Sequence, residues 1–169
     1  MRHLFSAIVA VSLVFCATSN AHLMVSEHGT LNFDDSGVYM VVSLSASSFG
    51  EADRDKNGKL SLTEFSAAKD SIILTIQDEI YMSQNEVKKQ LQGTMISPQV
   101  AHHGNGTDID QIVVMGKFTA VNHKHKLLFH NGLYGHGAEQ KLTMTAKYKR
   151  LGLKQRFVLT PKQLSAKVF

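Results

Sequence analysis

Residues 53–64 read DRDKNGKLSLTE, a polar segment in which side chains that carry oxygen recur at regular positions. Those at positions 1, 3, 5, 9 and 12 are Asp53, Asp55, Asn57, Ser61 and Glu64. Ca²⁺ is a hard cation that takes six to eight oxygen ligands, and this spacing offers them from one continuous loop. The segment is therefore predicted to be a single EF-hand calcium loop.

The other positions of the loop also fit this interpretation. Gly58 at position 6 permits the sharp turn, and Lys59 at position 7 would contribute only its backbone carbonyl, with its charge directed to water. Leu60 at position 8 is an apolar anchor. A turn rich in Asp and Asn that binds no metal is the competing interpretation, and the match at every position disfavours it. With three carboxylates and two nearby lysines, we expect a dissociation constant on the order of 10⁻⁵–10⁻³ M.

The sequence contains one such loop, which bears on its role. Calcium sensors pair two EF-hands and open an apolar groove when calcium binds. The segment before Asp53 is strand-like and ends in residues 47–50, SSFG, which make a poor entering helix. A structural staple is therefore favoured over a switch.

A helix is predicted over residues 61–77, directly after the loop. Phe65, Ala68, Ile72, Ile73 and Ile76 recur at the three-and-four spacing of an amphipathic helix. Ser61 followed by Glu64 three residues later is typical of a capping box at its start.

Short apolar or alternating segments on both sides of this helix predict about eight strands. The clearest is 142–148, where apolar residues alternate with Thr and Lys, and 153–159 would pair with it. Segments 79–82 and 90–96 are interpreted as a hairpin around Asn85. The chain is therefore predicted to be mainly β, an immunoglobulin-like antiparallel β-sandwich with an inserted EF-hand loop and one α-helix.

The first 21 residues have the pattern of a secretory signal peptide. A short basic start precedes an uncharged apolar run, and Ser19, Asn20 and Ala21 fit a cleavage site. An uncleaved anchor is the alternative, but the run is shorter than the ~20 apolar residues that span a bilayer. Cys16 follows the bulky Phe15, which argues against a lipoprotein. We expect cleavage near Ala21, a periplasmic or secreted β-sandwich domain over 22–169, and a mature form that does not span the membrane.

Several function classes are disfavoured by composition. The formal net charge is +4, spread along the chain with no dense Lys/Arg stripe, so nucleic acid is not an expected partner. No Ser, His and Asp residues stand in a nucleophile-elbow context, so no catalytic residues are assigned and an enzyme is not expected.

Histidines supply the alternative metal chemistry, because imidazole is a common ligand of transition metals. Those beyond the signal are His22, His28, His102, His103, His123, His125, His130 and His136. In an extended segment, His123 and His125 would point to the same side and suit one ion. Solvated loop histidines are the simpler interpretation, because no compact ligand spacing is present.

His22 would become the first residue after cleavage. Its α-amine and imidazole could then chelate copper, with His28 as a partner if the strand bends at Gly29. This resembles the copper brace of polysaccharide monooxygenases and periplasmic copper carriers. The alternative function is thus a periplasmic copper-, zinc- or nickel-binding protein that uses His22 and loop histidines, and a copper oxidase is a more remote one.

Sequence segments before, within and after the loop resemble those of a protein group. The segments are 21–33, 38–49, 53–65, 112–118, 127–135, 139–148 and 156–161. Together they resemble uncharacterised exported proteobacterial proteins with a single EF-hand. They also resemble, faintly, the exported domain of HupE/UreJ-type membrane proteins, which are linked to metal handling. The resemblance implies a periplasmic calcium-binding domain with no known activity, and another envelope protein is an expected partner.

Overall fold

The computed structural model of the chain describes residues 27–101, 106–135 and 140–169. The predicted signal at 1–21 lies outside these residues, as do four of the candidate ligands: His22, His102, His103 and His136. Within the described ranges, no helix is both long and apolar enough to cross a membrane.

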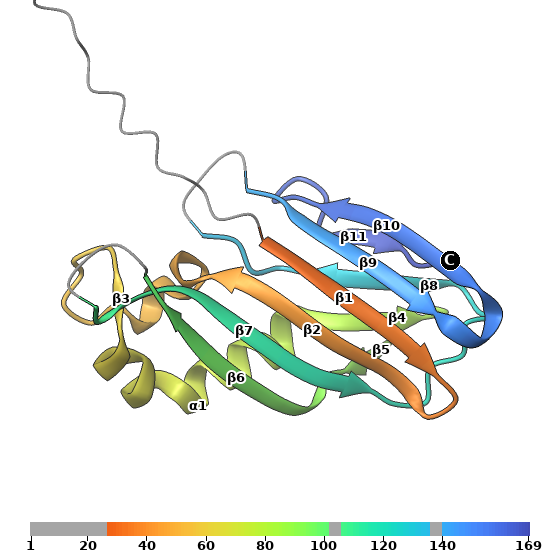
Figure 1. Cartoon of the computed structure of the whole chain (residues 1–169), viewed down its shortest axis with the longest axis horizontal. Coiled ribbons are helices and arrows are strands. Elements are labelled where there is room, and N and C mark those ends of the chain that lie inside the picture. The colour runs from red at the N-terminus through yellow and green to blue at the C-terminus, as the bar shows by residue number, and fades with distance from the viewer. Residues whose placement is uncertain (1–26, 102–105, 136–139) are drawn as a thin grey trace, which may run out of the picture.

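A large twisted sheet forms the front layer of the molecule (Figure 1). Its strands run in the order β10-β9-β1-β2-β7, and both β6 and β3 pair with β7. Their bounds are β1 Glu27–Asp34, β2 Gly37–Ser45, β3 Leu60–Ser61, β6 Gln92–Val100, β7 Asp108–Phe118, β9 Leu142–Tyr148 and β10 Leu153–Leu159.

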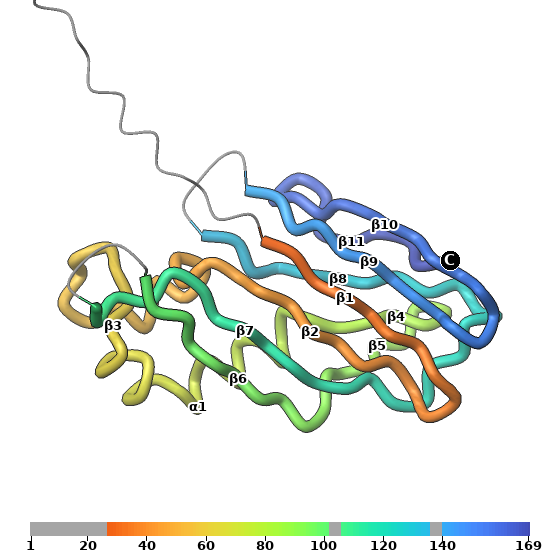
Figure 2. The backbone as a smooth tube through the Cα atoms, viewed as in Figure 1, coloured from red at the N-terminus to blue at the C-terminus, as the bar shows by residue number. Residues whose placement is uncertain are grey.

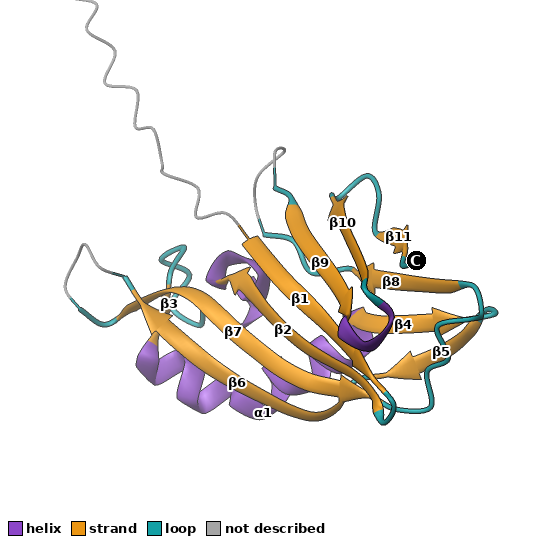
Figure 3. Cartoon of the chain, turned by 45° about the vertical axis from the view of Figure 1, so that its right-hand side comes forward, coloured by secondary structure: helices purple, strands orange, loops and turns teal. Residues whose placement is uncertain are grey.

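A smaller sheet and one long helix cover the back of this layer (Figures 1 and 3). The small sheet has the order β11-β8-β4-β5. Its strands are β4 Ile80–Gln84, β5 Val87–Gln90, β8 Leu127–Asn131 and β11 Ser165–Lys167. The helix is α1, Leu62–Glu79, and two short 3-10 helices are η1 Ala46–Ala52 and η2 Lys149–Leu151.

Side-chain alternation explains how the layers enclose one core. In β9 the residues Leu142, Met144, Ala146 and Tyr148 are buried, as the alternation predicts. Phe129 of β8 packs against aromatic side chains of the large sheet, including Phe118 of β7. The two sheets are therefore the faces of a single apolar interior.

Helix α1 begins at Leu62, one residue after its predicted start at 61. Ser61 is its N-cap, and the helix continues two residues beyond the predicted end at 77. Phe65, Ala68, Ile72 and Ile76 are buried and Ile73 is half-buried, which places most of the predicted apolar face against the core. Burial of each large aliphatic side chain contributes about 1.5–3 kcal/mol relative to exposure.

The prediction of a mainly β protein is confirmed, but one strand pair departs from the predicted antiparallel arrangement. Strands β1 and β9 run parallel, with Phe33 opposite Tyr148, whereas an antiparallel arrangement was expected. Figure 2 shows these two strands side by side although they lie near opposite ends of the chain. The immunoglobulin-like topology within the mainly β class stays a prediction.

The predicted hairpin around Asn85 has a different second strand. Asn85 and Glu86 both have positive φ, 47° and 70°, and form a two-residue turn that joins β4 to β5. The partner of β4 is therefore 87–90 rather than 90–96. Strand β6 pairs with β7 in the other sheet. The described residues form eleven strands rather than eight, and β11 had no sequence signal.

Candidate metal centre

The entrance to the loop is held by a short 3-10 helix instead of the long helix of a paired EF-hand. Helix η1 follows β2 directly, and Ala46, Phe49 and Ala52 anchor it in the core. Phe49 has non-helical φ and ψ of −117° and 42°, so the segment kinks before the loop begins. This agrees with the expectation that 47–50 is a poor entering helix.

The exit from the loop is held by the large sheet. Leu60 pairs with Ile109, and Ser61 pairs with Asp108 at the start of β7. The Leu62 N–H then donates to the Thr107 carbonyl over 3.0 Å. Leu60 is 3% exposed, as expected for the apolar anchor of the loop. Both ends of the loop are thus attached to the fold independently of any ion.

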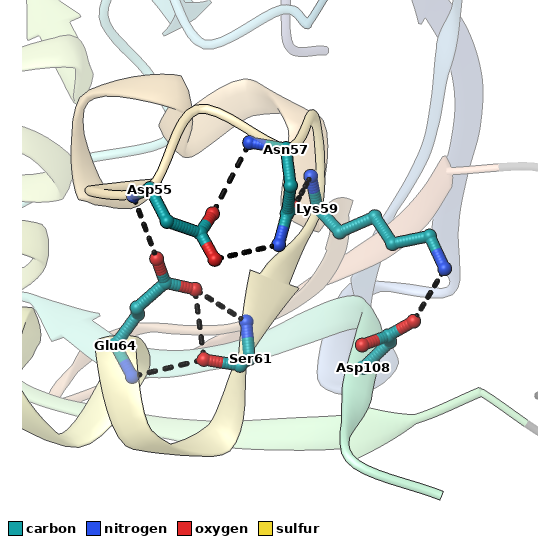
Figure 4. A network of polar contacts seen from close by, with 6 residues as sticks. All are labelled: Asp55, Asn57, Lys59, Ser61, Glu64 and Asp108. Carbon is teal, nitrogen blue, oxygen red and sulfur yellow. Dashed lines mark hydrogen bonds and ion pairs between the residues drawn. The ribbon is translucent and has the colours of Figure 1, made fainter. Parts of the chain in front are cut away.

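Glu64 connects the two ends of the loop (Figure 4). One carboxylate oxygen accepts hydrogen bonds from the Arg54 and Asp55 N–H groups, at 2.9 and 3.3 Å. The other accepts from the Ser61 N–H and hydroxyl, at 3.0 and 2.8 Å. The Ser61 oxygen in turn accepts from the Glu64 N–H at 3.2 Å, which completes the predicted capping box.

These bonds also determine the charge of Glu64. Donation by the Ser61 backbone, then by the Ser61 hydroxyl and the N–H groups of Arg54 and Asp55, lowers the pKa of Glu64 from 4.5 to about 2. The side chain is therefore a carboxylate at neutral pH and can accept a cation.

Asp53 and Asp55 are oriented by backbone donors from the middle of the loop. Asp53 accepts from the Asn57 N–H at 3.2 Å and from the Gly58 N–H at 2.8 Å. Asp55 accepts from the Asn57 N–H and side-chain amide, at 3.1 and 2.9 Å. Gly58 has φ of +80°, a conformation that residues with L side chains rarely adopt. The backbone conformation therefore explains why glycine occupies position 6 of the loop.

Three carboxylates converge in this loop. One oxygen each of Asp53, Asp55 and Glu64 lies within 4.8 Å of the others. Oxygens on opposite sides of a bound Ca²⁺ are separated by roughly 5 Å, since each lies 2.3–2.6 Å from the ion. The spacing is therefore compatible with three ligands of one Ca²⁺ ion.

The other predicted ligands lie in the same hydrogen-bond network. The Asn57 side-chain oxygen accepts from the Lys59 N–H at 2.8 Å, and Ser61 contacts Glu64. The Lys59 side chain leaves the loop and pairs with Asp108 over 2.6 Å (Figure 4). This pairing raises the pKa of Lys59 and keeps its positive charge out of the cation site.

Asp108 is a contributor to the site that sequence reasoning missed. It lies far along the chain from the loop, at the start of β7. Its role follows from the pairing of β3 with β7, which places it opposite Ser61. No local pattern in the sequence predicts the pairing of β3 with β7.

The described histidines lie in separate settings. His130 on β8 shares a hydrogen bond of 2.8 Å with the Ser165 hydroxyl and stacks on Tyr81, with ring centroids 4.4 Å apart. Burial lowers the pKa of His130. His28 lies on β1, in the large sheet.

The extended segment in which His123 and His125 would share one face is not formed. They lie in the connection between β7 and β8, where the His125 N–H donates to the Asn122 carbonyl in a turn. The His123 ring packs edge-on against Tyr148, at 4.9 Å between centroids. Within the described ranges, the acidic triad is the only cluster of His, Cys, Asp and Glu that could hold a metal ion. A site that uses His22 stays a prediction.

Comparisons with known proteins do not assign the chain to a family. No protein-family model matches the chain, and no curated protein matches it. The resemblance to exported single-EF-hand proteins and to HupE/UreJ-type domains therefore stays a prediction.

Proposed function

We propose that this chain is an exported calcium-binding protein without enzymatic activity, in which one Ca²⁺ ion staples the loop at 53–64 to helix α1 and to the large sheet. The observation that carries the proposal is the convergence of Asp53, Asp55 and Glu64 within 4.8 Å. These three occupy positions 1, 3 and 12 of a loop whose remaining positions also suit calcium.

A staple is favoured over a sensor by the way the loop is held. Its short strand β3 pairs with β7 of the same sheet, which is where a second EF-hand loop would pair in a sensor. Its entrance is a kinked 3-10 helix with buried anchors. Neither end has an apolar helix pair that could open on binding calcium. The calcium-loaded domain would then serve as a binding or assembly module for another envelope protein.

Replacing Glu64 with Gln is expected to weaken calcium binding by at least about tenfold, because it removes a charge and the bidentate closure of the loop. Isothermal titration of chelator-stripped protein measures the effect. Glu51→Gln is the matched control, since it removes the same charge two residues before the loop from an exposed side chain.

The control variant should retain nearly the full affinity. Equal weakening in both variants would show that general negative charge, and not this loop, attracts calcium. Unchanged calcium affinity in Glu64→Gln would show that the loop at 53–64 is not the calcium site.

A further inference from the structure

The outer face of the large sheet is the face that points away from helix α1 and the small sheet (Figures 1 and 3). Directly paired residues on neighbouring strands point to the same side of a sheet, so the strand register defines this face residue by residue. One row crosses the sheet from β6 to β10 and consists of Met95, Met115, Val41, Thr30, Thr145 and Arg156.

The part of this face formed by β2, β6 and β7 is apolar. Met95 is 60% exposed and Val41 is 41% exposed, and each is a register partner of Met115. Tyr39, two residues before Val41 on the same side of β2, is 45% exposed. An exposed group of apolar side chains bordered by polar ones indicates contact with a protein or a membrane.

The part of the face formed by β9 and β10 is cationic. Lys147 lies directly opposite Lys154, and Arg156 lies opposite Thr145 in the neighbouring row. All three cations are exposed. Like charges directly opposite each other on neighbouring strands are destabilising, so the fold maintains an unfavourable grouping of cations here.

Carboxylates are missing from these two rows of register partners. The second row consists of Lys117, Tyr39, Asn32, Lys147 and Lys154, and neither row contains Asp or Glu. At the end of β1, Asp34 accepts hydrogen bonds of 2.7 Å from Ser36 and interacts with Lys117. Within the described residues, the ion pairs use other cations, Lys59 and Arg150. The three cations of β9 and β10 are therefore left for a negative charge outside the chain.

This combination of apolar surface with charge of one sign discriminates among partners. A second copy docked through the same face would bring like charges together, because a two-fold contact pairs a surface with itself. A protein partner is normally matched by charges of both signs, which fix its orientation. An anionic bilayer offers one sign of charge above an apolar interior, and its mobile lipids require no fixed register.

We propose that the outer face of the large sheet binds the surface of an anionic phospholipid bilayer. Lys147, Lys154 and Arg156 contact the lipid phosphates, and their aliphatic stems lie along the apolar boundary. Met95 and Tyr39 enter that boundary, where tyrosine is a favoured residue. Neither row includes a residue of the calcium loop, so this contact goes beyond the calcium staple and does not depend on it.

The test is flotation of the mature chain, residues 22–169, with vesicles in the presence of a chelator. The chelator keeps calcium from bridging protein and lipid. The apolar run of the predicted signal would itself bind lipid, and its removal takes away no element of the fold, which begins at residue 27. We expect binding to phosphatidylglycerol vesicles and none to phosphatidylcholine vesicles.

Two double variants with the same net charge locate the contact. Lys147→Gln/Arg156→Gln should bind phosphatidylglycerol at least about tenfold more weakly, because each cation near an anionic surface contributes about fivefold. Lys69→Gln/Lys88→Gln removes two charges from exposed positions on α1 and β5, behind the large sheet, and should bind as the parent does.

A second pair of variants tests the apolar part of the contact. Met95→Gln should weaken binding at least about threefold, because it removes apolar surface that the bilayer would bury. Leu74 on α1 is 63% exposed, and Leu74→Gln should leave binding unchanged.

The proposal is overturned if the mature chain does not bind phosphatidylglycerol vesicles, or if the two double variants lose binding equally. Binding of soluble polyglutamate without vesicle binding would assign the face to an acidic protein instead. A dimer in sedimentation velocity that Met95→Gln disrupts, without vesicle binding, would assign it to a second copy of the chain.

Discussion

Replacing Phe118 with Ala is expected to lower the free energy of unfolding by about 3–5 kcal/mol, the usual cost of deleting a fully buried aromatic side chain. Phe118 is 0% exposed at the end of β7. Its ring meets Phe129 of β8 edge-on, at 6.4 Å between centroids and 77° between planes. The substitution would leave a cavity between the two sheets. Urea unfolding followed by circular dichroism measures the change.

Val113→Ala is the control on the same strand. Val113 is half-buried, and its register partners place it on the outer face of the sheet, away from the small sheet. Val113→Ala should lower the free energy of unfolding by less than about 1 kcal/mol. If Phe118→Ala and Val113→Ala lower the free energy of unfolding equally, the two sheets do not share the core described above.

Calcium is expected to raise the free energy of unfolding by about 2.7 kcal/mol when its free concentration is 100-fold above the dissociation constant, because it binds the folded chain alone. For a chain of this size, the midpoint of thermal unfolding should rise by roughly 5 °C or more. Chelator-stripped protein, scanned with and without calcium, measures the shift. We expect the effect to come from Asp53, Asp55 and Glu64, whose carboxylate oxygens lie within 4.8 Å of one another.

Magnesium provides the ionic control for this result. Mg²⁺ demands a tighter octahedral shell and retains its water, so it should raise the midpoint far less at equal concentration. The Glu64→Gln variant should lose most of the calcium shift. An equal shift with both ions would indicate general charge screening rather than a cage.

Local patterns predicted the parts of the fold whose causes are local. The alternation of 142–148 identified β9 because a strand with one buried face needs a period of two. The spacing of Phe65, Ala68, Ile72 and Ile76 identified the buried face of α1, and Ser61 with Glu64 identified its start. In the loop, every carboxylate that converges had been named from its position in the sequence.

Long-range pairing was beyond the reach of those patterns. The parallel contact of β1 with β9 joins segments from opposite ends of the chain, and neither segment encodes its partner. The turn at Asn85 was located, but Glu86 at φ of 70° made it a two-residue turn, which shortened the hairpin and freed β6 for the other sheet. Asp108 entered the site for the same reason, through pairing of β3 with β7.

The most direct test of the calcium loop is a calcium titration of the chelator-stripped chain, read at the amide of Gly58. This N–H donates to Asp53 at 2.8 Å, so it reports the closure of the loop itself. We predict a saturable shift of Gly58 and Leu60 with one site and a midpoint on the order of 10⁻⁵–10⁻³ M. No shift at Gly58 at calcium concentrations well above this range would contradict the assignment of residues 53–64 as a calcium site.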